Sequence, residues 1–484
     1  MTTKQLSLQC RSLSLLCLAS GALAMVSCVQ DDLTGEKFGS SVRNAQLEAP
    51  SADEITVTPS SDGSVQVFKW PVVEGAGGYH AILTNLDNNE VIKDTLIDNI
   101  TFAASRLEDT NYQLSLAVLD NEKLNNKGTE NVNKLYNTFS PTFQTIPTGT
   151  DLSTYFTENP VPDNGTTEML CYDLEAGGDY TLSSNLDFGN KRVTLRTTNA
   201  TNHAKIVYTD KVSLKTGTLL TLKNLDIDAT QSLNPVISLS ETPDESIKGT
   251  GDYYNIKGAV TINGCNFTGV NNNLVYDGNK KYCLESLVIN NSTIHLTLSS
   301  ETSVSGNAVI YFKGGFANTL QITNSTFWNN GNSDAKYFVQ YNNSGRATRA
   351  GYANSNVNFI NNTFYNIAKS GQWANYGGFA GQACSWFDVE KNIFVDCGNK
   401  QVARRILAGR TASSYTNVVF GYNTYMFNGE FESTGGIAEG YDVSGTAIEE
   451  DPGFKDAANG DFTISGAAQT SNKTGDPRWL PSAE

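Results

Sequence analysis

The sequence is poor in the residues that most often build catalytic and metal centres. It has three histidines among 484 residues, His80, His203 and His295, and they are far apart in the chain. No two cysteines have the C-x-x-C spacing of a zinc or redox site. Because metal and acid–base centres need such groups in clusters, these absences argue against a histidine- or cysteine-ligated site.

Charge and long helical patterns are also scarce. Charged residues make up 17% of the chain and aromatic residues 10%, and the formal net charge is −16. A nucleic-acid partner would require a basic surface, so this balance argues against one. Abundant Gly, Asn, Ser and Thr with short alternating apolar runs favour an all-β protein, and the length predicts two or more units.

The first residues have the pattern of an export signal. Lys4 and Arg11 precede an apolar run, residues 13–25, that is too short to span a bilayer. The next residues, "MVSC", resemble a bacterial lipobox and end on Cys28, the residue that would receive lipid. An ordinary signal peptide that is cleaved elsewhere is the alternative.

Two acidic residues, Asp31 and Asp32, follow this cysteine. They resemble the export tag of Bacteroidota lipoproteins displayed on the outer face of the outer membrane. We therefore expect a signal peptide at 1–27, a lipid anchor, a polar linker at 28–50 and a cell-surface location. No later segment is apolar enough to cross a membrane.

Five cysteines remain after the signal and the anchor. This odd number predicts neither a disulfide framework nor a zinc site, and we expect most of them to be small buried apolar residues. A Cys265–Cys283 or a Cys384–Cys397 bridge stays open. The five are Cys171, Cys265, Cys283, Cys384 and Cys397.

Residues 51–148 show short strands with alternating apolar side chains, at the size of an immunoglobulin-like sandwich. The segment resembles a fibronectin type III domain. Trp70 occupies the place of the core tryptophan, and Leu107 followed by Tyr112 resembles the tyrosine corner. We expect this domain to be a spacer and Trp70 to be a core residue.

One phrase recurs seven times in the rest of the chain. Positions 1, 3 and 8 are apolar or aromatic, and positions 5 and 6 are mostly Asn, Gly or Ser. Successive copies start 27 to 40 residues apart, which is typical of a solenoid. The copies are "LTLKNLDI", "VTINGCNF", "LVINNSTI", "LQITNSTF", "VNFINNTF", "FDVEKNIF" and "VVFGYNTY".

This repeat predicts a right-handed parallel β-helix over about residues 151–445. Positions 1 and 3 share one face of a strand and point inward. Asn tolerates the left-handed backbone of a tight corner, after which position 8 points inward again. Stacked copies align their asparagines, so that side-chain amides bond from coil to coil. A second β-sandwich would not explain a constant corner.

The β-helical part resembles the pectate-lyase-like superfamily. Its ending, "DPGFKDAANGDFTI" and "GDPRWLP", resembles the closing segment of β-helix lipoproteins in Bacteroidota polysaccharide-utilisation systems, including members whose domains have no assigned function. The resemblance implies a closing segment at 446–484, a pectin-like polysaccharide as ligand, and proteins of an outer-membrane import complex as partners.

The sequence does not show the catalytic set of the superfamily. Its lyases use Arg or Lys as base and hold calcium with carboxylates, and its hydrolases gather aspartates and a histidine. The pairs Asp226/Asp228 and Asp388/Glu390 point out of the coil and could give oxygens to calcium, but solvated outward positions explain them better. We expect no cofactor or metal, and Ca²⁺ enters only under a lyase alternative.

Residues 301–411 carry ten Lys or Arg against five Asp or Glu, with aromatic residues between them. Arg binds carboxylates with two hydrogen bonds, and aromatic faces stack on sugars, so this stretch suits an acidic polysaccharide. Scattered surface charge is the alternative. The candidate carbohydrate-binding residues are Lys313, Trp328, Tyr341, Arg346, Arg349, Trp373, Arg404, Arg405 and Arg410.

Two of these expectations depend on local pattern. Trp328 follows the inward Phe327 and should face outward. The stretch "QVARRILAGR" alternates like a strand, so that either Arg404 or Arg405 must face inward or lie at a bend.

Three functions remain open. The first is a surface lipoprotein that binds an acidic, pectin-like polysaccharide for import. The second is a polysaccharide lyase with Arg404, Arg405, Arg346 or Lys313 as base, which calcium dependence would favour. The third is a structural or adhesion protein, which the fold alone could support.

Overall fold

The computed structural model describes residues 42–60, 65–87, 90–107, 109–299, 308–342, 347–431 and 440–481. The chain divides into two compact units, Met1–Thr138 and Phe139–Glu484. Cys28 and Arg346 lie outside the described residues. No helix in the described ranges is long and apolar enough to cross a membrane.

The first unit is the expected β-sandwich. Its buried core contains Phe68, Trp70 and Leu114, and Trp70 is 2% exposed, as predicted. One antiparallel sheet has the order β1 (Thr56–Pro59), β2 (Val65–Lys69), β5 (Thr101–Ser105). The other has the order β4 (Glu90–Ile97), β3 (Tyr79–Asn85), β6 (Asn111–Val118), β7 (Val132–Asn137).

The tyrosine corner of this sandwich is present. Tyr112 is fully buried, and its hydroxyl accepts a hydrogen bond from the backbone N–H of Leu107 at 2.8 Å. The unit ends before the predicted boundary at Thr148. The reason is that the strand β8 (Thr142–Ile146) pairs in parallel with the next strand of the second unit.

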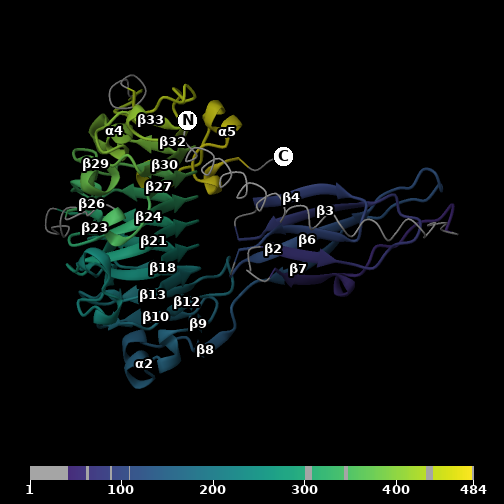
Figure 1. The fold of residues 1–484 in the computed structure, drawn as a ribbon, viewed down its shortest axis with the longest axis horizontal. Helices are drawn as coiled ribbons and strands as arrows, with labels where there is room; N and C mark the ends of the chain where they lie inside the picture. The colour runs from purple at the N-terminus through teal and green to yellow at the C-terminus, as the bar shows by residue number, and fades with distance from the viewer. Residues whose placement is uncertain are drawn as a thin grey trace, which may run out of the picture. The chain divides into compact units, whose positions relative to one another are not determined.

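The second unit is a parallel β-helix, whose coils follow one another in the colour order of Figure 1. Three sheets run along it, which we call sheets A, B and C. Sheet A holds β8, β9 (Leu170–Leu174), β12 (Val193–Arg196), β15 (Leu220–Lys223), β18 (Tyr254–Asn263), β21 (Tyr282–Asn290), β24 (Phe316–Thr323), β27 (Ser355–Ile360), β30 (Ser385–Glu390) and β32 (Asn417–Gly421).

Sheets B and C complete each coil. Sheet B holds β10 (Asp179–Leu182), β13 (Ala204–Tyr208), β16 (Leu225–Asp228), β19 (Asn266–Val270), β22 (Thr293–Leu296), β25 (Thr326–Asn329), β28 (Thr363–Tyr365), β31 (Ile393–Val395), β33 (Thr424–Phe427) and the antiparallel β34 (Glu430–Phe431). Sheet C holds β11 (Leu186–Asp187), β14 (Leu214–Thr216), β17 (Ile237–Leu239), β20 (Val275–Tyr276), β23 (Ala308–Phe312), β26 (Tyr337–Tyr341) and β29 (Gln372–Asn375).

Four short α-helices accompany the coil within the described ranges. They are α2 (Leu152–Glu158) before β9, α3 (Gly377–Ala380), α4 (Val402–Ile406) and α5 (Ala467–Asn472). The stretch from 151 to 220 therefore contributes both a helix and further coils, through β9 to β14.

The corner between sheets A and B is the predicted one. Position 5 of all seven copies has a positive φ, between 48° and 65°. Asn and Gly tolerate this conformation, and Lys391 and Tyr422 adopt it in the last two copies despite its steric cost. The seven residues are Asn224, Gly264, Asn291, Asn324, Asn361, Lys391 and Tyr422.

Position 6 forms a buried ladder from coil to coil. The side chain of Asn392 donates to the Oδ1 of Asn423 at 2.9 Å and accepts from the amide of Asn362 at 2.9 Å. In the preceding coils Ser325 and Ser292 continue the ladder through their backbone N–H groups. The predicted amide bonding between coils is confirmed.

Position 8 fills the interior with stacked rings. Phe327, Phe364, Phe394 and Tyr425 follow one another at centroid distances of 5.5, 5.2 and 5.5 Å, and each is at most 2% exposed. Offset stacking of this kind stabilises the core beyond simple burial.

The chain ends in a segment that returns along sheet B, and we call residues 451–480 the strap. Asp476 accepts from the hydroxyl of Thr326 at 2.7 Å, and the indole N–H of Trp479 donates to the same hydroxyl at 2.8 Å. Arg478 reaches Asn291 at 3.1 Å. The strap therefore covers the outer face of several coils of sheet B.

Candidate functional site

Two of the predicted surface residues belong to the core. Trp373 is 0% exposed and stacks on Phe338 at 4.4 Å, and Tyr341 is 2% exposed. Both lie on sheet C, in β29 and β26, in stretches without a repeat phrase. The sequence identified two strands per coil and missed this third one, so we withdraw both residues from the candidate surface.

Trp328 faces outward from sheet B, as predicted, but it is not a free platform. Its ring stacks on His295 at 3.8 Å with an angle of 6° and meets the edge of Phe462 at 5.9 Å. Phe462 comes from the strap. Local alternation therefore predicted the direction of the side chain, and a segment distant in sequence decided its exposure.

Three predicted basic residues are exposed and share one edge of the coil. Lys313 precedes β24, Arg349 lies in a 3₁₀ turn (Ala347–Ala350) before β27, and Arg410 follows α4 before β32. Lys313 and Arg349 belong to turns from sheet C to sheet A, and Arg410 lies between α4 and sheet A. The parallel coils place these turns along the same side of the molecule.

Arg404 and Arg405 lie on a helix, α4, and not on an alternating strand. Val402, Ala403, Ile406 and Leu407 are buried at helical spacing, so that both arginines remain half-buried on the outer side. The expected alternating strand is absent, so the choice between an inward arginine and one at a bend does not arise. Burial and the charge of Arg404 lower the pKa of Arg405.

An exposed tryptophan that the sequence interpretation left out of the candidates lies on sheet A. Trp386 is 46% exposed, in the strand β30. It is in register with Asn356 and Thr319 of the two preceding coils. Asn356 donates to the hydroxyl of Thr319 at 3.1 Å. Trp386 comes just before the inward Phe387, so the same alternation that was applied to Trp328 could have found it.

A row of polar side chains runs beside this tryptophan. Gln321, Asn358 and Asp388 are in register on β24, β27 and β30 and face outward, half-buried. None of the three side chains has a hydrogen-bond partner among the residues that the structure describes. Burial and then the charge of Glu390 raise the pKa of Asp388. We call Gln321, Asn356, Asn358, Trp386, Asp388 and Glu390 the Trp386 face.

The other carboxylate pair has local partners. Asp226 lies 2.9 Å from the Nδ1 of His203 and accepts from the amide of Asn266 at 2.8 Å. The sequence left His203 isolated because 23 residues and a coil turn separate it from Asp226. Within the described ranges, no group of three or more His, Cys, Asp or Glu residues is placed to hold a metal ion.

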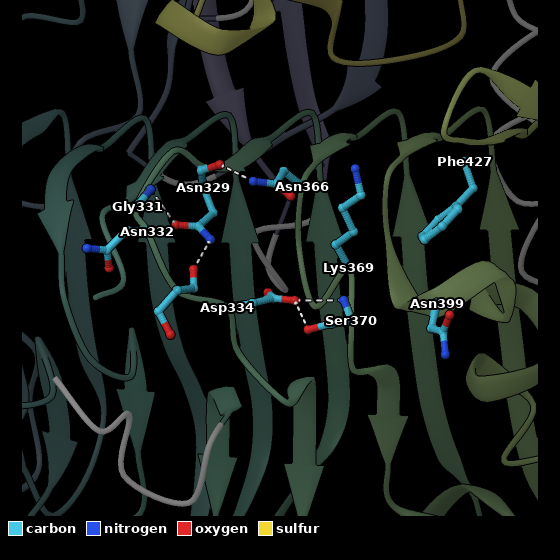
Figure 2. A pocket seen from close by; sticks show the side chains of 10 residues that line it. Asn329, Gly331, Asn332, Asp334, Asn366, Lys369, Ser370, Asn399 and Phe427 are labelled. Atoms are coloured by element: carbon cyan, nitrogen blue, oxygen red, sulfur yellow. Dashed lines mark hydrogen bonds between the residues drawn. The ribbon is translucent and has the colours of Figure 1, made fainter. Parts of the chain in front are cut away.

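A cleft of about 600 Å³ lies at the corner between sheets B and C (Figure 2). Most of its polar groups are already paired. Ser370 donates to Asp334 at 2.9 and 3.0 Å, the amide of Asn329 donates to the carbonyl of Ser333 at 2.8 Å, and Lys369 pairs with Asp396 at 2.8 Å. Burial raises the pKa of Asp334. These bonds hold the turns together, and the Oδ1 of Asp334 is buried without a hydrogen-bond partner among the described residues.

The five cysteines are free thiols, and four of them are buried. Neither of the two open disulfide pairings is present. Burial raises the pKa of Cys265 and of Cys283 to about 12, which leaves these thiols protonated and unreactive at neutral pH.

Three families match successive parts of the chain, and each is described as a domain of unknown function. Residues 1–177 match DUF4992, residues 178–330 match DUF4957 and residues 320–479 match DUF5123. No curated protein matches the chain. Among solved structures, the pectate lyase Pel3 from Pectobacterium carotovorum is similar at 12% identity, over 76% of this chain and 90% of that chain, with a TM-score of 0.19. The geometry of the site must therefore carry the functional argument.

Proposed function

We propose that the chain binds a polysaccharide on the Trp386 face. The observation that carries this proposal is an exposed indole beside three outward side chains that lack hydrogen-bond partners among the described residues. An indole packs against the apolar face of a sugar ring, and amide and carboxyl groups bond its hydroxyls. Unpaired polar groups that are already half-buried lose little further hydration when a ligand bonds them.

The register of the coil suits an extended ligand. Neighbouring strands lie about 4.8 Å apart, so that Gln321, Asn358 and Asp388 form a straight row of about 10 Å along the coil axis. A glycan lying along this row meets one polar group per coil while a sugar ring rests on Trp386. Such a ligand is a chain and not a single sugar.

The basic edge favours an acidic, pectin-like polysaccharide. Lys313, Arg349 and Arg410 border sheet A from exposed turns, in a chain of net charge −16. Cations along one edge attract carboxylates of the glycan, and a surface that is acidic elsewhere directs such a ligand toward that edge.

The N-terminal pattern supports a location for this activity. We propose that lipid on Cys28 anchors the chain in the outer membrane, with the coil at the cell surface. There it would deliver glycan to the proteins of an outer-membrane import complex. Radioactive palmitate that labels the parent protein but not Cys28→Ala would support the anchor.

Affinity electrophoresis in polygalacturonate tests the binding proposal. The Trp386→Ala variant should lose most of the retardation that the parent protein shows, whereas Leu233→Ala should keep it. Leu233 is a matched control because it is 40% exposed on a turn after sheet B, away from sheet A.

The same assay separates the alternatives. Equal retardation of the Trp386→Ala and parent proteins would contradict the proposed face. Absorbance of an unsaturated product, formed in the presence of calcium, would make the chain a lyase. No retardation in acidic or neutral glycans would contradict polysaccharide binding and favour adhesion.

A further inference from the structure

Two neighbouring arginines on α4 have no anionic partner among the residues that the structure describes. Arg404 and Arg405 are half-buried, and the Nε atoms of both are shielded from solvent without a hydrogen-bond partner among the described residues. Within the same ranges neither guanidinium makes an ion pair. Consecutive like charges at this depth repel each other, and no carboxylate of the described residues offsets this repulsion.

The described residues around the pair include aromatic rings. The guanidinium of Arg404 lies over the ring of Tyr441, 6.0 Å from its centroid. Besides Arg404, the groups that act on the charge of Arg405 are the phenols of Tyr337 and Tyr441. The nearest acid in sequence to Tyr441 is Asp442, whose oxygens accept from Tyr425 at 2.9 Å and Ser444 at 2.6 Å.

We infer that Arg404 and Arg405 form a binding site for an oxyanion, and specifically for the carboxylate of a uronic acid residue in a glycan. A carboxylate accepts two hydrogen bonds from one guanidinium and offsets the repulsion between the two. The tyrosine rings limit competition from water, which strengthens a charged hydrogen bond.

This site is separate from the Trp386 face. Sheet A carries that face, whereas α4 packs beside β29 of sheet C. The identity of the ligand as a glycan rests on the proposed function, but the affinity of the pair for an oxyanion does not. The two claims can therefore fail independently.

The experiment compares two ligands that differ in charge alone. Isothermal titration of the full mature chain uses tetragalacturonate and its fully methyl-esterified form. The parent protein should bind the acid at least tenfold more tightly. Arg405→Gln should reduce this ratio to below about threefold, and Arg404→Gln/Arg405→Gln should abolish it. Arg43→Gln, which removes an exposed arginine of the first unit, should keep the ratio.

Two further measurements identify the chemical class of the anion and test whether the variants are folded. Arg405→Lys keeps the charge but not the paired hydrogen bonds, and should give an intermediate ratio while circular dichroism remains that of the parent. A sulfated galactan tetramer that binds more tightly than tetragalacturonate, and depends on Arg405, would support the oxyanion site but overturn the uronate assignment.

The possible outcomes separate the arginine site from the Trp386 face. Equal affinity for the acid and its ester in the parent protein, or a ratio that survives in the folded double variant, would overturn the arginine site. A Trp386→Ala protein that loses affinity for both ligands but keeps their ratio would support both claims. If Trp386→Ala changes neither affinity, the Trp386 face fails while the arginine site stands.

Discussion

Asn392 and Asn358 are the same residue type in neighbouring copies of one phrase, but their environments are opposite. Asn392 is 0% exposed, and its side chain exchanges hydrogen bonds with Asn362, Phe359, Glu390 and Asn423. Asn358 is half-buried on the outside and has no partner for its amide among the described residues. The interior ladder uses the amide of Asn392 for structure, and the Trp386 face leaves the amide of Asn358 for a ligand.

The largest effect should come from the interior. Asn392→Ala removes several buried hydrogen bonds and leaves amide and carbonyl groups of neighbouring coils unpaired, so we expect a loss of about 2–4 kcal/mol in the free energy of unfolding. Urea denaturation followed by circular dichroism measures it. An Asn358→Ala protein should unfold within about 0.5 kcal/mol of the parent. Equal losses of unfolding free energy in the two variants would contradict the difference between the two environments.

Asn358, which contributes little to stability, should contribute to glycan binding. Asn358→Ala should weaken the affinity for polygalacturonate about three- to tenfold, because it removes one hydrogen bond worth about 0.5–1.5 kcal/mol. Isothermal titration gives the affinity. Thr261→Ala, an outward position of sheet A several coils earlier, serves as the control and should bind like the parent. An unchanged affinity in Asn358→Ala would remove this amide from the proposed site.

A smaller effect should come from the corner that separates the two environments. Lys391 holds a φ of 55° at a position where most copies have Asn. Lys391→Asn should raise the free energy of unfolding by about 0.5–1 kcal/mol, because Asn adopts the left-handed conformation with less strain. Thermal and urea unfolding measure the gain. The Lys391→Ala variant keeps the strained backbone conformation, so its free energy of unfolding should not rise.

The smallest effect concerns the charge of Asp388. Its pKa is raised in the folded state, so folding favours the neutral carboxyl, and the parent protein loses stability as the pH rises through that value. Asp388→Asn should match the parent near pH 3.5 and be more stable at pH 7. Urea denaturation across this range tests the sign. In a Glu390→Gln background the difference should shrink, and a difference that grows would contradict the assigned cause.

Much of the fold could be predicted from the repeat, but its third sheet could not. Positions 1, 3, 5, 6 and 8 of the phrase determine the strands of sheets A and B and the corner between them. Sheet C strands such as β29 lie in stretches whose length and pattern vary between coils, and nothing periodic marks them. Trp373 was therefore taken for a surface residue, although it belongs to the core.

The candidate site was predicted in part, and the errors have a common origin. The basic edge with Lys313, Arg349 and Arg410 is exposed as expected. The alternation along its strand predicts that Trp386 faces outward, but Trp386 was not among the predicted binding residues. The sequence did not predict that Arg404 and Arg405 lie on the same surface. The pattern indicated a strand, whereas these residues form the five-residue helix α4.

The sequence by itself determined the coil, its left-handed corner and the direction in which each strand residue points. These properties depend on backbone conformation and on a period of two, which are local. The tertiary structure alone decided which outward residues stay exposed, since the strap covers Trp328 and leaves Trp386 free. Exposure depends on segments that meet only after folding, and no local pattern encodes that meeting.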